Sequence, residues 1–225
     1  MEIKDTLLFQ NLKKEEIQRV LHCSNAKLLT FDKHQEIISP DDHPEVLYLI
    51  LKGKVLLEQF NYMGKPMNIE YRKTGELFAQ ETLFLENDKF DYSVRATEPC
   101  KILTANKNFF FQTCEKSCAH HSKVIYNMLH IFALENQQKQ QRLELLTCGE
   151  LTQRIARYLM ETSSGDSIVN LSMNRSELAA YLNVARPSLS RTLSSMQEQK
   201  IIEIHGRNQI EILDFENLQA LIDGL

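Results

Sequence analysis

Two different hydrophobic periods divide the chain. In the first half, apolar residues form short runs rich in β-branched and aromatic side chains, as is typical of strands. Gly53, Gly64 and Gly75 separate several of these runs at even spacing. The predicted strands occupy residues 46–51, 55–60, 67–71, 92–96 and 100–105. A short amphipathic helix around Ile17, Val20 and Leu21 precedes them. This pattern predicts a small antiparallel β-barrel or jelly roll.

Residues 116–146 contain neither glycine nor proline and keep a helical apolar stripe. The stripe consists of Val124, Met128, Ile131 or Phe132, Glu135 and Leu143 to Leu146. A helix of this length extends about 45 Å at 1.5 Å per residue, which is too long for one small domain. We therefore expect a dimerisation helix whose stripe forms a coiled coil with a second copy of the chain.

The period after residue 147 predicts helix, strand, helix-turn-helix and β-hairpin. Asn174 and Glu177 have the spacing of a capping box, and Pro187 is compatible with the first turn of a second helix. Two amphipathic helices joined by a short turn also occur in many all-α domains. The predicted strand at 168–172 and the hairpin at 201–213 favour a winged helix-turn-helix that binds DNA.

The second of these helices is predicted to read the major groove. Leu189, Leu193 and Met196 fall on one face of it, whereas Ser188, Arg191 and Ser195 fall on the other. An arginine there can donate two parallel hydrogen bonds to guanine. The predicted DNA-binding residues are Arg175, Arg186, Pro187, Ser188, Ser190, Arg191, Lys200 and Arg207.

Composition places the chain among ordinary globular proteins, with 43% hydrophobic and 25% charged residues. No run approaches the roughly 18 apolar residues that span a bilayer, and the N-terminus lacks the order of a signal peptide, so we expect a cytoplasmic protein without a membrane partner. Five cysteines with irregular spacing fit reduced thiols in that compartment. The absence of a P-loop, His-Glu-x-x-His or Gly-x-Ser-x-Gly motif predicts that the protein is not an enzyme.

Net charge alone does not indicate a DNA-binding protein. The chain carries −4, and residues 147–225 hold seven Lys and Arg against ten Asp and Glu. Five of those seven cations nevertheless lie between Arg175 and Arg207, where phosphates would be contacted. We therefore expect binding to depend strongly on salt concentration.

The run LKGKVLLEQ, a Gly-Lys turn and GELFAQETLF together resemble the cyclic-nucleotide-binding-type domain of the Crp/Fnr regulators, and the helix-turn-helix resembles theirs. The resemblance implies an α+β chain with an effector-binding sensor domain at 1–115, a dimerisation helix at 116–146 and a winged helix-turn-helix domain at 147–225. It also implies a bacterial-type transcription regulator, a homodimer that binds an inverted repeat in double-stranded DNA and RNA polymerase as a partner.

The resemblance places the effector site around the helical turn after Gly75 and on the long helix. The residues that it implies are Gly75, Glu76, Leu77, Phe78, Gln80, Phe90, Asp91, Lys139 and Gln140. In the cyclic-AMP-binding members that this segment resembles, a Gly-Glu pair stands here, and an Arg-Ser or Arg-Thr pair follows further on. This chain has Ala79-Gln80 and Phe90-Asp91 instead.

A carboxylate at the second of those positions would repel a phosphate, so the expected effector is an unknown small molecule other than cyclic AMP. Two alternatives remain open. A shift of the loop by one residue would place Lys89 where it could pair with a cyclic phosphate, or the pocket is vestigial and this segment is only a loop of the barrel. The family's recognition helix has a glutamate beside its first arginine, and Pro187 stands there in this chain. That replacement predicts an altered DNA site in which Arg191 still reads a guanine.

A thiol- or metal-based redox sensor is the alternative function on this scaffold. Its weak candidate ligands are Cys114, Cys118, His120 and His121, although the two histidines point about 100° apart on a helix. The cysteine cluster that holds an iron–sulfur centre in the oxygen-sensing branch is absent, and Cys23 stands alone, so no iron–sulfur cluster is expected. A single haem ligand among His22, His34 and His43 stays open.

Overall fold

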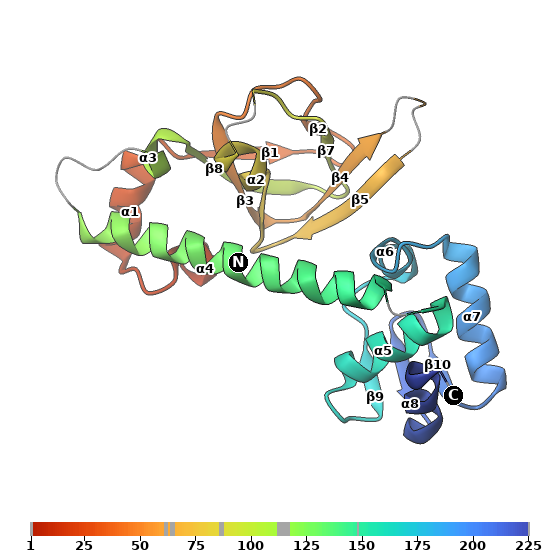
Figure 1. Ribbon diagram of the computed structural model, residues 1–225. Coiled ribbons are helices and arrows are strands. Elements are labelled where there is room, and N and C mark those ends of the chain that lie inside the picture. The colour runs from red at the N-terminus through yellow and green to blue at the C-terminus, as the bar shows by residue number, and fades with distance from the viewer. Residues whose placement is uncertain are drawn as a thin grey trace. The chain divides into compact units, whose positions relative to one another are not determined.

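The computed structural model describes residues 2–60, 63, 66–85, 88–111, 118–147 and 149–224, with 66–68 described by backbone alone. It divides into two compact units, Met1–Leu134 and Glu135–Leu225, and the boundary lies inside one long helix, α4 (Figure 1). The predicted turn around Gly64 and the predicted helix start at 116–117 lie outside the described residues.

The first unit is built on two four-stranded antiparallel sheets, as the strand pattern predicted. One sheet has the order β1-β8-β3-β6 and the other the order β2-β7-β4-β5. Its strands are β1 Lys27–Phe31, β2 Glu36–Ile38, β3 Val46–Lys52, β4 Lys54–Phe60, β5 Pro66–Lys73, β6 Leu77–Phe78, β7 Ser93–Ala96 and β8 Cys100–Asn106. Its helices besides α4 are η1 Ile3–Asp5, η2 Leu7–Phe9, α1 Lys14–Cys23, α2 Gln80–Phe84 and α3 Asn108–Phe111.

Strand β3 contributes to two cores because its side chains alternate between the faces of the sheet. Ile50 packs with Ile102 and Phe78 between the two sheets. Leu47, Leu49 and Leu51 face the other way, onto the helical layer. That layer supplies Leu8, Phe9, Val20, Val124, Met128 and Ile131 from η2, α1 and α4. The barrel therefore has a core of its own and a second core beneath its helices.

Helix α4, Ala119–Thr147, corrects the predicted dimer stripe. Val124, Met128 and Ile131 are buried in the core of their own unit, and Leu145 is buried in the second unit. They are not available to a second chain. A second set of exposed residues, which shares only Leu143 with the predicted stripe, follows a four-three spacing along α4, and we call it the outer stripe. It consists of Ser122, Tyr126, Leu129, Ala133, Asn136, Gln140, Leu143 and Thr147.

The second unit has the predicted winged helix-turn-helix. Its elements are the end of α4, α5 Leu151–Ser163, β9 Ile168–Asn170, α6 Arg175–Tyr181, α7 Arg186–Glu198, β10 Ile202–His205, β11 Gln209–Ile212 and α8 Phe215–Asp223. The antiparallel sheet has the order β10-β11-β9. Leu159, Leu178, Leu189, Leu193 and Ile210, each at most 1% exposed, centre one core. No helix among the described residues is long and apolar enough to cross a membrane.

Candidate functional site

Local signals in the sequence fix both ends of α6, the first helix of the helix-turn-helix. The Asn174 side chain accepts hydrogen bonds from the backbone N–H groups of Ser176 and Glu177 at 2.9 and 3.1 Å, and Glu177 accepts from the Asn174 N–H. At the other end Asn183 takes the left-handed conformation with φ +53°, and the Val184 N–H donates to the carbonyl of Ala179 at 2.9 Å. This Schellman-type ending turns the chain sharply into α7.

Two arginines hold the C-terminal end of α6, and the sequence analysis did not single them out. Arg142 on α4 donates to the carbonyls of Tyr181 and Ala180, both at 3.0 Å, and Arg154 on α5 donates to the carbonyl of Leu182 at 3.0 Å. The last carbonyls of a helix lack intrahelical partners and carry partial negative charge. In the sequence Arg142 has no acidic residue three or four positions away, whereas Arg154 has Glu150 four positions before it, and neither pattern indicates a partner in α6.

Helix α7 presents a polar face opposite its buried leucines. Pro187, Ser190, Arg191 and Ser194 are exposed and recur at i, i+3, i+4 and i+7, so they lie on one face. Ser194 was not among the predicted residues. Ser188 was predicted on this face, but it is only half-exposed, at the flank. Arg191 Nε lies 3.4 Å from the Pro187 carbonyl oxygen, so the guanidinium stays on the same helix face.

The other predicted phosphate contacts lie around α7. Arg186 is exposed at the start of the helix, Lys200 is exposed just after its end, and Arg207 is exposed in the turn between β10 and β11. Arg175 differs because it is half-buried, and burial lowers the pKa of its guanidinium. Its Nη1 atom is buried without a hydrogen bond in the described part of the chain. The DNA-binding roles of all these residues stay predictions.

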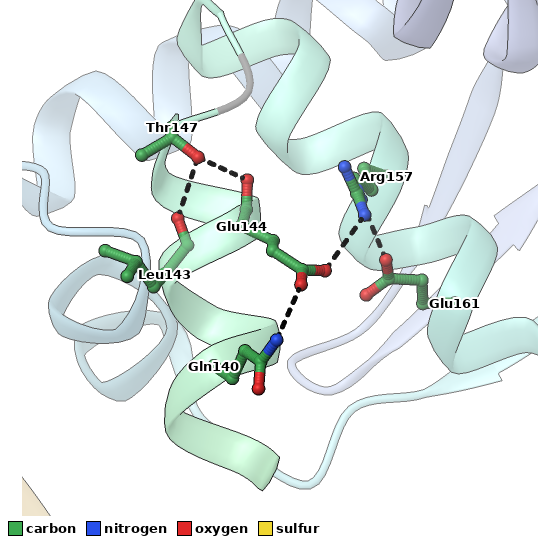
Figure 2. Close-up of polar contacts among 6 residues, drawn as sticks. All are labelled: Gln140, Leu143, Glu144, Thr147, Arg157 and Glu161. Atoms are coloured by element: carbon green, nitrogen blue, oxygen red, sulfur yellow. Dashed lines mark hydrogen bonds and ion pairs between the residues drawn. The ribbon is translucent and has the colours of Figure 1, made fainter. Parts of the chain in front are cut away.

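A polar network joins the end of α4 to α5 (Figure 2). Arg157 donates to Glu161 at 2.8 Å and lies 3.8 Å from Glu144, which accepts from Gln140 at 3.5 Å. The Thr147 hydroxyl donates to carbonyls one turn back, at Leu143 and Glu144. Gln140, which was predicted to contact an effector, is also a member of the outer stripe. Lys139, which was predicted with it, is exposed.

Most of the predicted effector residues in the first unit, Met1–Leu134, which we call the sensor unit after its predicted role, are packed inside it. Leu77, Phe78, Gln80 and Phe90 are at most 4% exposed. The Gly75 N–H donates to the Ile50 carbonyl, the Glu76 carboxylate accepts from the Lys73 N–H, and the exposed Asp91 accepts from Gln59 at 2.8 Å. A role in effector binding stays a prediction for every one of them.

Ala79 shows why the related pattern has glycine at this position. It adopts φ +64°, a left-handed conformation that favours glycine, while it is almost fully buried at the start of α2. The turn is held further on by Thr82, whose hydroxyl lies 3.0 Å from the Tyr92 hydroxyl. Burial raises the pKa of Tyr92 to about 12, so this phenol stays protonated at neutral pH. This chain thus forms the left-handed turn before α2 without a glycine.

A cavity of about 440 Å³ lies elsewhere in the sensor unit. Residues from α2, α3 and the segments before β3, after α2 and before α3 line it. None of them was among the predicted effector-binding residues, although His43 was left open as a haem ligand. They are His43, Pro44, Glu45, Leu83, Asp88, Lys107, Asn108 and Phe111. Lys107 and Glu45 form an ion pair at 2.6 Å, so the lining presents both signs of charge.

The candidate thiol and metal ligands near the start of α4 have separate surroundings. Cys114 lies outside the described residues, and Cys118 is half-exposed. His121 stacks on Phe109 with ring centroids 4.3 Å apart, whereas His120 is buried. Burial, reinforced by Arg19, lowers the pKa of His120. A sensor role for these four residues stays a prediction.

The lowered pKa of His120 predicts a pH-dependent stability. The unfolded chain takes up the proton at a higher pH than the folded chain, so the free energy of unfolding should fall as pH drops from 8 through 6.5 and below. His120→Gln should flatten this dependence in thermal unfolding followed between pH 8 and 5.5. His130→Gln, an exposed histidine on the same helix, serves as the control. Parallel curves for wild type and His120→Gln would contradict the assignment.

Comparison with known proteins agrees with this architecture. Residues 28–117 match the cyclic nucleotide-binding domain, and residues 153–221 match the Crp-like helix-turn-helix domain. The cyclic AMP receptor protein of Thermus thermophilus is 23% identical over 223 residues, which cover 99% of this chain and 100% of that protein. The global nitrogen regulator of Nostoc sp. is 23% identical over 187 residues, covering 79% and 82%.

Solved structures share the fold. A CooA mutant from Carboxydothermus hydrogenoformans matches with a TM-score of 0.71 at 15% identity, covering 98% of this chain and 94% of that one. FixK2 from Bradyrhizobium japonicum matches with a TM-score of 0.61 at 21% identity, covering 87% and 96%. A barrel of the cyclic-nucleotide-binding type followed by a Crp-like winged helix-turn-helix is the architecture of a DNA-binding transcription regulator. The chain belongs to the Crp/Fnr family of such regulators.

Proposed function

We propose that this regulator acts as an effector-gated homodimer that recognises an inverted repeat in double-stranded DNA. The observation that carries the proposal is the exposed face of α7, where Arg191 and two serines stand opposite a fully buried leucine face. A short helix of this kind fits the major groove. In a two-fold dimer, two such helices one DNA turn apart, roughly 34 Å, contact matching half-sites.

The outer stripe of α4 is the proposed dimer interface. Its apolar members Tyr126, Leu129 and Leu143 are 69, 63 and 62% exposed in the single chain. The spacing of the whole stripe is that of the a and d positions of a coiled coil. Asn136 and Gln140 interrupt the apolar positions, and a polar residue in such a seam fixes the register of the two helices at some expense of stability. The proposed interface therefore combines apolar contacts with polar positions that fix the register, and it is not apolar along its whole length.

The effector is proposed to be a small molecule other than cyclic AMP, bound in the sensor unit. Asp91 supports this proposal, because Phe90-Asp91 stands where the resembling cyclic-AMP-binding members have an arginine-containing pair. The carboxylate of Asp91 is exposed and would repel a phosphate there. Phe90, which precedes it, is buried against Tyr92 and offers no charge. Native mass spectrometry of freshly purified protein tests this proposal. Retention of a cyclic nucleotide would contradict it, and retention of another small molecule would support it.

Arg191→Ala is expected to weaken binding to the preferred DNA site by about 1–3 kcal/mol and to relax one base position in each half-site. The reason is the loss of a bidentate contact to guanine. The wild-type site is first selected from a random DNA library, and affinities are then measured for that site and its single-base variants.

Lys200→Ala is the matched control for this experiment. Lys200 is exposed just beyond α7, so its substitution should weaken binding equally for all sequences and reduce the salt dependence by about one contact. If Arg191→Ala lost affinity uniformly, as Lys200→Ala should, base reading by Arg191 would be rejected. If no sequence were enriched from the library, sequence-specific recognition itself would be rejected.

A further inference from the structure

Three side chains with metal-binding donors converge on the outer face of the β10–β11 hairpin. Antiparallel pairing places Glu203 directly opposite Glu211, and His205 follows two residues along the same strand. The alternating residues Ile202 and Ile210 are fully buried beneath them. The inner face thus fixes the hairpin on the core, and the outer face holds two carboxylates and an imidazole at fixed backbone positions.

The charges of this group are unbalanced. Like charges directly opposite one another on a sheet destabilise the pair. His205 Nε2 lies 2.8 Å from a Glu211 carboxylate oxygen, whereas the Glu203 carboxylate has no ion pair or hydrogen bond within the described part of the chain. No lysine or arginine of that part lies in an ion pair with either glutamate. A cation placed between the two carboxylates would remove the repulsion.

We propose that Glu203, His205 and Glu211 form a binding site for a divalent transition-metal ion such as Zn²⁺. The nearest donor atoms of the three residues all lie within 4.8 Å of one another. An ion bonded to imidazole nitrogen and carboxylate oxygen at about 2.0–2.2 Å requires them to close in only slightly, which exposed side chains can do by small rotations. One nitrogen and two oxygens suit Zn²⁺ and its neighbours in the first transition row, and two carboxylates neutralise the charge of the ion.

The site adjoins the part of the hairpin that would meet DNA. Gly206 and Arg207 follow His205 in the hairpin turn, and Arg207 is exposed there. Without a metal, two carboxylates oppose the approach of phosphates to that arginine. A bound metal ion would neutralise the two carboxylates and remove this repulsion. This second part of the inference rests on the proposed function, whereas metal binding itself does not.

Metal binding is tested first on the full chain without DNA. Titration calorimetry with ZnCl₂ should find one more site per chain in wild type than in Glu203→Gln or His205→Gln. His34→Gln and Glu216→Gln remove an exposed histidine and an exposed carboxylate elsewhere and should keep that site. Co²⁺ distinguishes it from cysteine sites, because only thiolate ligands add an intense near-ultraviolet band. Equal stoichiometry in wild type and both wing variants would overturn the proposal.

The effect on DNA is tested with a site selected from a random library in the presence of EDTA. Addition of ZnCl₂ should then tighten wild-type binding by about three- to tenfold at low salt, as two surface charges are neutralised, and should leave His205→Gln unchanged. Failure to select any DNA would reject the proposed function and leave the calorimetric result standing. Selection without a Zn²⁺ effect on wild type would reject the link between this site and DNA.

Discussion

Replacing Tyr126 and Leu129 together by aspartate is expected to convert the proposed dimer into monomers. Both side chains are exposed on the outer stripe of α4, and four carboxylates would face one another across a two-fold seam. Binding to an inverted repeat should weaken by at least about 100-fold, because the two half-sites would then be bound independently. Sedimentation equilibrium gives the oligomeric state, and fluorescence anisotropy gives the affinity for DNA.

Gln138→Asp with Gln141→Asp is the matched control for the outer stripe. Both glutamines are exposed on α4 but lie away from the stripe, so this pair adds the same charge to the same helix. The control should remain dimeric and bind DNA as wild type does. A dimeric Tyr126→Asp/Leu129→Asp protein would show that the chains associate through another surface, and the outer stripe would have to be abandoned as the interface.

Leu193→Ala should have the largest effect on stability, about 2–5 kcal/mol. Leu193 on α7 is 1% exposed and packs in the core of the second unit with Leu189 and Met196. Its truncation leaves a cavity beneath α7, the helix that we propose reads the DNA sequence. The unfolding transition of the second unit should therefore move to lower denaturant concentration in urea titrations of the full chain, while the transition of the sensor unit stays in place.

Ser194→Ala tests whether that loss comes from the core. Ser194 is the next residue along α7 but is exposed, so its substitution should change stability by no more than about 0.5 kcal/mol. A loss from Leu193→Ala that did not exceed the loss from Ser194→Ala would mean that this core rearranges to fill the space. Because both substitutions introduce alanine at adjacent positions of α7, the difference between their stability losses measures the contribution of core packing rather than of helix formation.

The sequence predicted the second unit well because its signals are local. The capping box at Asn174, the proline at the start of α7 and the alternation around the hairpin each depend on residues only a few positions apart. The helix α8, Phe215–Asp223, was nevertheless missed. So were three strands of the sensor unit: β6 has only two residues, β2 has three, and β1 is exposed over most of its length and shows no alternation in burial.

The long helix shows what periodicity cannot decide. Val124, Met128 and Ile131 have the spacing of a coiled-coil seam, but a helix that covers the core of its own unit requires the same spacing. The exposed stripe with Tyr126 and Leu129 is weaker in hydrophobicity because Asn136 and Gln140 interrupt it. Only the tertiary structure separates the two, because it shows which residues the chain itself has already covered. The hydrogen bonds of Arg142 and Arg154 to α6 escaped prediction for the same reason.

Arg142 links the end of α4 to α6, the first helix of the helix-turn-helix. Its guanidinium is attached to the last turns of α4, and it donates to the carbonyls of Ala180 and Tyr181 at the end of α6. Arg154 fastens Leu182 to α5 in the same way. Removing either arginine would leave carbonyls at the end of α6, just before the tight turn at Asn183, without these partners.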